Sequence, residues 1–313
     1  MEQKSTREAY GRVLVELGRE NPDVVVLDAD LSKSTMTAFF AREFPERFFD
    51  CGVAEQNMIG IAAGLAVSGK TPFASTFAVF APGRCYDQMR MSVAQPGLNV
   101  KVVSTHGGVS VGEDGTSHHA IEDLALACTL PGFNVIVPAD AAEAEQAVRT
   151  AAQTYGPFYI RMSRPKTPAV FSSDYRFTLG TATTLREGGD VAVIALGLMV
   201  EIALEAAESL ARDGIECRVL SMSTLKPLDK DAVVRAAKET GAVVTVEEHL
   251  RHGGLGSAVA QVVCEQCPVP MSIMAINDAY CKSGKPQELL QKCGLTAPDI
   301  ERTVRSLVSR KSG

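Results

Sequence analysis

The chain has 313 residues, of which 46 % are hydrophobic and 22 % charged, proportions typical of a soluble globular protein with room for two domains. Its 31 lysines and arginines stand against 37 aspartates and glutamates, and this net charge of −6 argues against a nucleic acid or a membrane surface as the partner. No apolar segment follows the first charged residues, and the longest apolar run, Val191 to Val200, is too short to cross a bilayer. We therefore expect a cytoplasmic protein.

The eight cysteines are scattered singly along the chain, which favours reduced and mostly buried thiols over a disulfide framework. The one CxxC pair, Cys264 and Cys267, falls at the end of an expected helix. No second ligand pair lies near it in the sequence, so a redox or zinc role at this pair is the weakest functional hypothesis. The sequence alone assigns no role to these two cysteines.

The first half of the chain alternates expected strands and helices. Ser5 to Glu8 and Asp140 to Glu143 are capping-box patterns that predict the starts of two helices. Continuous apolar runs such as Val24 to Leu27 are typical of strands covered on both faces of a parallel sheet. Further strands are expected at 48–51, 71–77, 99–104, 135–137 and 158–161, and further helices at 35–43, 55–68, 82–94 and from about 121. This alternation predicts a doubly wound α/β domain over residues 1–170.

The second half repeats this pattern after an expected linker at residues 171–189. Strands are expected at 191–195, 216–220, 242–247 and 271–276, so residues 190–313 should form a smaller α/β domain. Thr296 is expected to cap the final helix. Gly253 to Gly256 favours a strand-to-helix turn over a phosphate loop, and His249 and His252 beside it are expected in a loop.

The stretch from Asp50 to Gly64, DCGVAEQNMIGIAAG, places Glu55 in the first turn of an expected helix. Alone, an acid there is explained by its favourable interaction with the helix N-terminus. Together with PFASTFAVF at 72–80 and VGEDGTSHHAIED at 111–123, however, the stretch resembles the thiamine-diphosphate transketolase family. More narrowly, the chain resembles the C-terminal half of a split transketolase, and the resemblance covers essentially its whole length.

The resemblance implies a site for thiamine diphosphate. In the family, a glutamate that hydrogen-bonds a ring nitrogen of the cofactor's aminopyrimidine favours the tautomer that deprotonates the thiazolium carbon, and Glu55 matches this glutamate. Phe77 and Phe80 match the aromatic residues that stack on the aminopyrimidine, whereas Phe73 is expected in the core. Asp30 resembles an acid near the thiazolium ring, although a turn-capping role is an equally good interpretation.

The glycine-flanked acidic turn at 112–115 carries two further family matches. Gly and Asp are common turn residues, so the segment in isolation is explained as a turn. In transketolases the residue matching Asp114 bonds a substrate hydroxyl, and the one matching His118 lies beside the cofactor's amino group. This chain has Thr116 and Ser117 where the family commonly shows Pro-Thr, and a second histidine, His119, follows.

Four more positions match family residues that hold the phosphate of a sugar phosphate. They are Arg7, Ser34, His106 and Arg164. An arginine at a helix start is usually a solvated charge, but four matches in order imply a phosphorylated sugar. The implied reaction transfers a two-carbon ketol unit from a ketose phosphate to an aldose phosphate, with pentose phosphates as the default sugars. Glu55 would activate the cofactor, while His106, Asp114 and His118 position hydroxyls and move protons.

The family's GDG…N segment, which holds the diphosphate and a divalent metal (Mg²⁺ or Ca²⁺), lies in a separate N-terminal domain and has no counterpart in this sequence. The resemblance therefore implies an N-terminal partner subunit that supplies the metal site, and no metal ligand is expected here. We expect a heterotetramer of two such chains and two partners. The helix at 55–68 is a candidate contact surface, because Gly60, Ala63 and Gly64 permit close approach.

Several alternatives remain open. The β-subunit of a 2-oxo-acid dehydrogenase has a similar size and fold but would lack His106 and the GEDGxxH arrangement. A fragment of a 1-deoxyxylulose-5-phosphate synthase is a further possibility, and the native-looking chain start argues against it. A non-catalytic scaffold that stabilises a partner is disfavoured by the retention of Glu55 and of the four phosphate-site residues.

Overall fold

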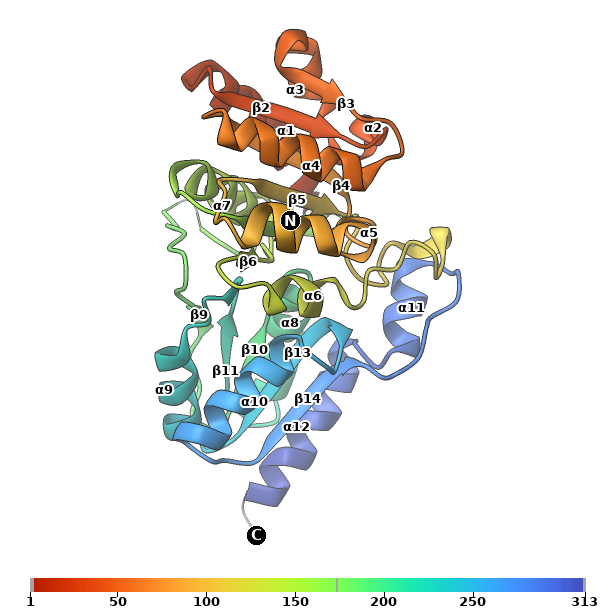
Figure 1. The fold of residues 1–313 in the computed structure, drawn as a ribbon. Helices are drawn as coiled ribbons and strands as arrows, with labels where there is room; N and C mark the ends of the chain where they lie inside the picture. The colour runs from red at the N-terminus through yellow and green to blue at the C-terminus, as the bar shows by residue number, and fades with distance from the viewer. Residues whose placement is uncertain (1–2, 173, 312–313) are drawn as a thin grey trace.

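The computed structural model describes residues 3–172 and 174–311, which form two large sheets, each with helices packed on both faces, and one small two-stranded sheet (Figure 1). The first sheet has the strand order β12-β6-β7-β5-β4-β2-β3 and is parallel except for β12. Its strands are β2 (Val24–Asp28), β3 (Phe48–Asp50), β4 (Thr71–Phe77), β5 (Lys101–Thr105), β6 (Asn134–Ile136), β7 (Phe158–Arg161) and β12 (Thr224–Lys226). The continuous apolar runs therefore form a doubly wound sheet, as predicted.

Helices cover both faces of this sheet. One face carries α1 (Thr6–Glu20), α3 (Ala38–Glu43) and α7 (Ala141–Gln153), and the other carries α4 (Glu55–Val67), α5 (Ala81–Gln88), the π-helical turn η2 (Met89–Ala94) and α6 (Asp123–Thr129). Both predicted helix starts are confirmed, and each has a side-chain N-cap. Ser5 Oγ accepts from Glu8 N at 3.4 Å, and Asp140 Oδ1 accepts from Glu143 N at 2.9 Å.

One predicted helix is divided in the structure. The helix expected at 35–43 becomes α2 (Ser32–Thr35) and α3, because Met36 between them adopts a left-handed conformation with φ of 70°. A non-glycine residue in this region cannot continue a right-handed helix. The short 3-10 turns η1 (Pro45–Arg47) and η3 (Gly112–Asp114) complete the connections of the first half.

The second sheet has the order β14-β13-β10-β11-β9, with only β9 antiparallel among its described strands. The strands are β9 (Thr183–Arg186), β10 (Val191–Ala195), β11 (Cys217–Ser221), β13 (Val243–Leu250) and β14 (Met271–Ile276). Helices α8 (Met199–Ala211) and α12 (Ala297–Lys311) cover one face, and α9 (Lys230–Thr240) and α10 (Leu255–Gln266) cover the other. The short α11 (Pro286–Lys292) lies beside the loop that carries η3 (Figure 1).

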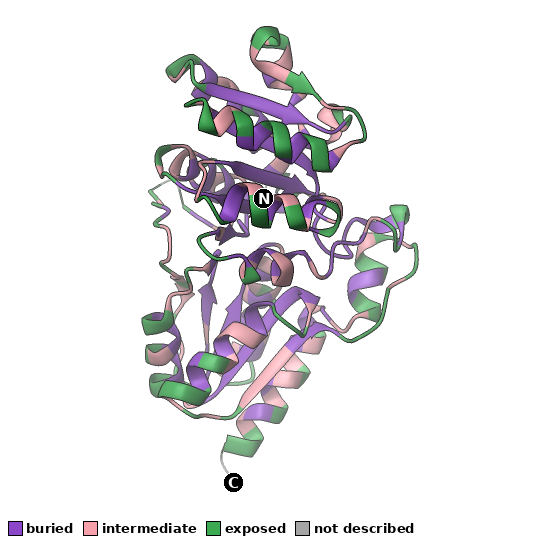
Figure 2. Ribbon diagram, in the orientation of Figure 1, coloured by how far each residue is buried: buried purple, intermediate pink, exposed green. Residues whose placement is uncertain are grey.

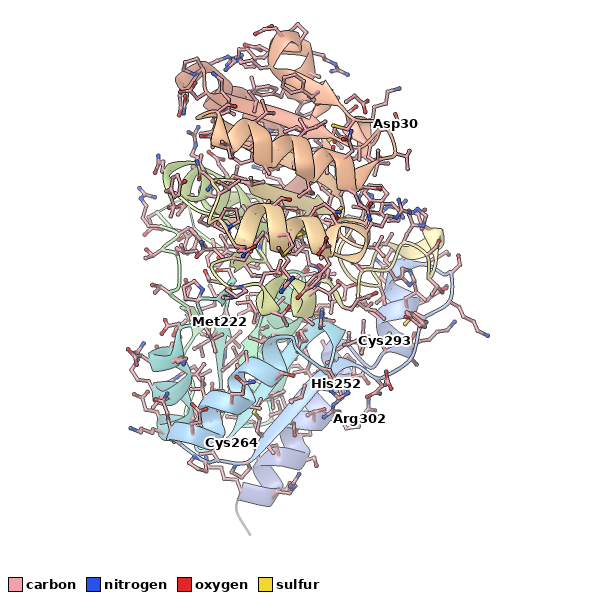
Figure 3. The ribbon with its side chains drawn as sticks, in the orientation of Figure 1. Asp30, Met222, His252, Cys264, Cys293 and Arg302 are labelled. Atoms are coloured by element: carbon pink, nitrogen blue, oxygen red, sulfur yellow. The ribbon has the colours of Figure 1, made fainter. Side chains whose placement is uncertain are left out.

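Two predictions for the second half were wrong. Residues 183–186, expected within a linker, form the edge strand β9. His249, expected in a loop, lies in β13 and is fully buried, whereas His252 is exposed in the following loop (Figure 3). A small two-stranded sheet, β1 (Gln3–Lys4) with β8 (Thr167–Pro168), closes the start of the chain against the residues after β7.

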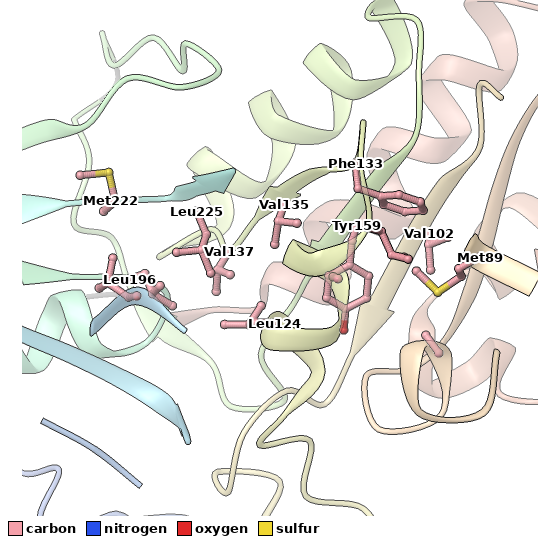
Figure 4. Packing of buried hydrophobic residues seen from close by; sticks show 14 of the residues in the cluster. Met89, Val102, Leu124, Phe133, Val135, Val137, Tyr159, Leu196, Met222 and Leu225 are labelled. Carbon is pink, nitrogen blue, oxygen red and sulfur yellow. The ribbon is translucent and has the colours of Figure 1, made fainter. Parts of the chain in front are cut away.

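The two sheets share a hydrophobic core. Leu196, Met222 and Leu225 from the second half pack in one cluster with Val135 and Val137 from the first half (Figure 4). Strand β12 crosses the boundary as well, because it pairs with β6. The central strands of both sheets are buried, whereas the edge strand β3 and the outer faces of the helices are exposed (Figure 2). Among the described residues, no helix has the length and apolar character needed to cross a membrane.

Candidate cofactor and substrate site

The predicted site residues gather at one edge of the first sheet. Strands β2, β4 and β5 run parallel, so their carboxyl ends meet at the same edge. Asp30 follows β2, Phe77 ends β4, and His106 follows β5. Open α/β sheets place ligands outside the carboxyl ends of their strands. The sheet itself therefore brings together residues that are far apart in sequence.

Glu55, the first residue of α4, is buried with 4 % of its surface exposed. Its Oε1 accepts a hydrogen bond from Arg84 Nη1 of α5 at 2.8 Å. The backbone carbonyl of Arg84 in turn accepts from Gln56 Nε2 at 2.9 Å. Sequence reasoning missed Arg84, because a contact between residues 29 positions apart leaves no periodic or capping signal. The buried carboxylate is thus held by one arginine from the neighbouring helix.

Aromatic rings form a wall beside this ion pair. The rings of Phe77 and Phe80 are stacked with centroids 5.9 Å apart, and Phe77 also stacks on His106 at 3.9 Å. His118 meets Phe80 edge-on at 5.4 Å. The guanidinium carbon of Arg84 lies 4.0 Å from the centre of the Phe80 ring. Arg84 therefore links the Glu55 carboxylate to the aromatic residues. Phe73 is fully buried and belongs to the core, as predicted.

A second histidine, His119, stabilises the turn that carries Asp114 and His118. His119 is buried, and its Nε2 donates to the carbonyl of Gly112 at 3.2 Å. Ser117 Oγ lies 2.9 Å from His118 Nδ1, within hydrogen-bond distance. Ser117 and His119 both contact the segment they belong to.

The second domain also supports this turn. Ser283 Oγ donates to the carbonyl of Glu113 at 2.5 Å, and Thr116 Oγ1 donates to the carbonyl of Cys281. The thiols of Cys281 and Cys293 lie 3.1 Å apart in the second domain, where Figure 3 labels Cys293. The two hydrogen bonds of Ser283 and Thr116 were not predicted from the sequence, because they join residues more than 160 positions apart.

The four residues predicted to hold a phosphate lie in one corner of the site. Arg7 donates from Nη1 to the carbonyl of Ser34 at 2.6 Å and from Nη2 to the carbonyl of Arg164 at 3.4 Å. Its Nε is buried and has no hydrogen-bond partner among the described residues. Arg164 lies 3.7 Å from Asp114 Oδ2. Burial lowers the pKa of Arg7, and repulsion from Arg164 is the second cause. Two guanidinium groups thus share a corner that an anion would stabilise.

His106 borders the same corner. It is 4 % exposed and adopts a left-handed conformation with φ of 63°. Its Nδ1 lies 2.8 Å from Thr105 Oγ1, within hydrogen-bond distance. Burial lowers the pKa of His106 to about 3, with further contributions from Arg7, Arg164 and His118. The imidazole is therefore neutral near pH 7 and can donate or accept a hydrogen bond but does not supply a charge.

Asp30 lies at the same edge but stands apart from the Glu55 cluster. It has a left-handed conformation with φ of 61°, its side chain is exposed, and its backbone N donates to Asp50 Oδ1 at 3.1 Å (Figure 3). Among the described residues, no hydrogen bond joins its side chain to Glu55. The buried Asp28 beneath it accepts from Thr35 Oγ1 at 2.7 Å and Thr37 Oγ1 at 2.8 Å, and burial raises its pKa to about 6.

Within residues 3–172 and 174–311, no three His, Cys, Asp or Glu side chains gather in a group that could hold a metal ion. Cys264 is exposed on α10, and Cys267 follows the helix end. Figure 3 places Cys264 on the second domain, whereas Asp30 lies on the first. The structure thus adds no ligand to this cysteine pair.

Two family models match the chain. Residues 2–169 match the model described as transketolase, pyrimidine binding domain. Residues 180–300 match the model described as transketolase, C-terminal domain. The first match alone covers more than half of the chain and includes every residue assigned above to the carboxyl edge of the first sheet.

Relatives of similar length agree with these matches. A "Putative transketolase C-terminal section" of Methanocaldococcus jannaschii is 45 % identical over 304 residues, covering 96 % of this chain and 95 % of the relative. The 6-deoxy-6-sulfo-D-fructose transketolase subunit SqwH of Clostridium sp. (strain MSTE9) is 42 % identical over 312 residues, covering 100 % and 97 %. A solved structure named "Split gene transketolase, inactive beta4 tetramer" is 54 % identical with a TM-score of 0.92, covering 98 % of this chain and 99 % of that one.

Proposed function

The chain belongs to the transketolase family as the C-terminal section of a split transketolase, and on this premise we propose that it forms one half of a thiamine-diphosphate site completed by a partner subunit. The half formed here would bind the aminopyrimidine of the cofactor and the phosphorylated end of the sugar. The diphosphate and its metal, Mg²⁺ or Ca²⁺, would be bound mainly by the N-terminal subunit. A cytoplasmic location and pentose phosphates as substrates belong to the same proposal.

One observation carries this proposal, namely the buried carboxylate of Glu55 beside the wall formed by Phe77, Phe80 and His118. A buried carboxylate costs several kcal/mol unless a donor satisfies it, and Arg84 is that donor in the chain without cofactor. The aminopyrimidine is flat and polar at its edge, so an aromatic wall next to a carboxylate fits both properties. Thiamine diphosphate, when bound, supplies the chemistry that breaks and forms the carbon–carbon bond.

The chain's own residues would orient the reactants and move protons. Glu55 would hold a proton at the pyrimidine ring nitrogen and so set the tautomer of that ring. Asp114 and His118, at the end of the turn fixed by the second domain, would bind substrate hydroxyls and the edge of the pyrimidine. His106, kept neutral by burial and by two arginines, would act as a hydrogen-bonding group beside the substrate.

The corner formed by Arg7, Ser34, His106 and Arg164 supports a sugar with an anionic end group. Guanidinium groups bind phosphate oxygens through paired hydrogen bonds, and the unpartnered Nε of Arg7 leaves one such donor available. One relative is named for a sulfosugar, whose sulfonate is also tetrahedral but carries only a single charge. The same corner would accept either group, so we propose a sugar phosphate as substrate and a sulfosugar as the second candidate.

The exposed face of α4 supports a contact with another subunit. Gly60 and Gly64 face outward, and an added Cβ at either position would meet no atom within 4 Å. Ala63, predicted on the same side, instead packs into the core. Ile61 beside the glycines is 38 % exposed, and Val53 just before the helix is 73 % exposed. We propose that subunits pack here within a heterotetramer, whereas the chain without its partner would lack activity.

The test combines this chain with an N-terminal transketolase subunit, thiamine diphosphate and magnesium. Formation of glyceraldehyde 3-phosphate from xylulose 5-phosphate and ribose 5-phosphate is followed. In a second reaction 6-deoxy-6-sulfofructose replaces xylulose 5-phosphate as the donor, and the four-carbon sulfonated aldose that remains after transfer of two carbons is followed. We expect activity only in the mixture, and a loss of at least about 100-fold for Glu55→Ala, because the carboxylate sets the protonation of the cofactor. Glu46→Ala, at an exposed glutamate of η1, is the matched control.

Two outcomes would contradict the proposal. Activity of this chain without the partner would show that the diphosphate and metal are bound by the chain itself. Full activity of Glu55→Ala in the mixture would remove the half-site for the aminopyrimidine. Activity with the sulfosugar alone would retain the half-site and replace the phosphate by a sulfonate.

A further inference from the structure

Arg84 makes both of the contacts that an aminopyrimidine would need at this site. Its planar guanidinium donates to Glu55 Oε1 at 2.8 Å and lies 4.0 Å from the centre of the Phe80 ring. A flat heterocycle that is protonated at its ring nitrogen would donate to the same carboxylate and stack on an aromatic residue of the same cluster. Guanidinium groups resemble such a heterocycle, because they are planar, donate in the ring plane and stack on aromatic faces.

We propose that Arg84 is a placeholder for the aminopyrimidine in the free subunit and that it leaves Glu55 when the cofactor binds. The inference rests on the proposed function, since it assigns the aminopyrimidine to Glu55. Arg84 would then be a positioning residue, because it holds the carboxylate in place until the ligand arrives. It would also set the affinity for the cofactor, because the two donors compete for one acceptor.

The anchoring of Arg84 permits this exchange. Its backbone is fixed by the hydrogen bond from Gln56 Nε2 to the Arg84 carbonyl at 2.9 Å, whereas its side chain is 47 % exposed. The guanidinium can therefore turn into solvent while α5 stays in place. Glu55 has no such freedom, since its side chain is only 5 % exposed at the start of α4. The mobile donor leaves, and the buried acceptor remains.

The cost of the exchange determines the expected effect. When only a fraction of molecules is competent to bind, the apparent dissociation constant rises by the inverse of that fraction. If Arg84 occupies Glu55 in about nine of ten free molecules, its removal lowers the dissociation constant about tenfold. Partial exposure weakens the ion pair, so we expect a decrease of about three- to tenfold.

The experiment measures the dissociation constant of thiamine diphosphate in magnesium by isothermal titration calorimetry, using this chain in complex with its N-terminal partner. We expect tighter binding for Arg84→Ala and for Arg84→Gln, which retains a neutral amide donor should the alanine variant fold poorly. Arg84→Lys should lie closer to the unsubstituted chain, because lysine keeps the charge but not the planar group. Arg90→Ala, at an exposed arginine in the adjoining turn η2, should leave the constant unchanged.

The outcomes separate this inference from the proposed function. If both Arg84→Ala and Arg84→Gln bind thiamine diphosphate with unchanged or weaker affinity, the proposal that Arg84 is a placeholder is wrong, even where Glu55→Ala abolishes activity. Full activity of Glu55→Ala would instead overturn the proposed function itself. In a Glu55→Gln background the gain from Arg84→Ala should disappear, because the competition requires the carboxylate.

Discussion

Arg161 at the end of β7 donates from Nη2 to the backbone carbonyl of Glu248 on β13 at 2.8 Å, and this bond joins the two sheets. The Glu248 carboxylate reaches back in the opposite direction and accepts from Ser110 Oγ at 3.1 Å and from the backbone N of the same serine. Ser110 lies in the segment that leads to Asp114 and His118. The second domain therefore fixes the loop on which part of the candidate site depends.

The first prediction concerns this connection between the domains. Arg161→Ala removes a buried cation that also lies 3.6 Å from Asp123 Oδ1, a carboxylate only 1 % exposed. Breaking a buried pair leaves an uncompensated charge, so we expect a loss of about 3–5 kcal/mol in the free energy of unfolding. Urea denaturation monitored by circular dichroism measures this free energy of unfolding. Arg186→Ala, whose partner Glu216 is half exposed, should cost less than about 1 kcal/mol, and an equal loss in the two variants would refute the assignment.

Elements encoded by local pattern were the ones that the sequence predicted well. Strands β4, β7, β10 and β14 coincide with the predicted strand segments, because strands of a mainly parallel sheet are rich in buried apolar residues. The helix starts at Ser5 and Asp140 followed from side chains that accept from a backbone N three residues away. These signals are carried within a few residues of the chain.

Elements that depend on distant partners were missed. His249 was expected in a loop because it lies beside the Gly253 to Gly256 turn. Its Nε2 instead accepts from Ala125 N of the first domain at 3.3 Å, and this contact permits its burial in β13. Strand β12 completes the sheet of the other domain, which no local pattern encodes. At the site, the family resemblance supplied Glu55, but its partner Arg84 became visible only in the packing of α4 against α5.

The second prediction concerns stability as a function of pH. Glu247 is buried and accepts from the backbone N of Leu255 and Gly256, each at 2.7 Å, and burial raises its pKa to about 7. A raised pKa means that the folded chain binds the proton more tightly than the unfolded chain. The stabilisation of the folded chain by protonated Glu247 is therefore fully present below the pKa of the unfolded chain, near 4.5. As the pH rises towards 7, this stabilisation is lost, by up to about 3 kcal/mol.

Glu247→Gln tests this, since glutamine cannot ionise and still accepts one of the two hydrogen bonds. Urea unfolding at pH 5 and pH 8 should give a smaller decline in stability for the variant than for the unsubstituted chain. Glu265→Gln, at an exposed glutamate of α10, should leave the decline unchanged. Parallel declines in all three proteins would mean that Glu247 ionises normally in the folded chain.

The third prediction concerns the anionic end of the sugar. Arg7→Ala and Arg164→Ala each remove a guanidinium from the proposed phosphate corner. Charge-assisted hydrogen bonds contribute about 1.5–3 kcal/mol, so the KM for a ketose phosphate should rise about 10- to 100-fold in the reconstituted enzyme, with a smaller change in kcat. The KM for an unphosphorylated ketose should not change. Arg12→Ala, at an exposed arginine of α1, is the control, and equal increases with both sugars would assign the arginines to folding instead.

The fourth prediction concerns the protonation of His106. Burial and the neighbouring Arg7 and Arg164 lower its pKa to about 3, so its ring should remain neutral from pH 8 to pH 5 in a ¹³C or ¹⁵N NMR titration. The unfolded chain binds a proton at this histidine near pH 6.5, whereas the folded chain does not. Stability from this residue is therefore present above pH 6.5 and is lost on acidification, by about 1.4 kcal/mol per pH unit.

His106→Asn isolates this contribution, because asparagine tolerates the left-handed backbone that His106 adopts with φ of 63°. The difference in unfolding free energy between pH 7 and pH 5 should be about 2 kcal/mol smaller in the variant. The other histidines cancel, since the variant retains them. A ring that titrates near pH 6.5 would contradict this, and His106 would then act beside the substrate as a proton donor with a charge, not as a neutral hydrogen-bonding group.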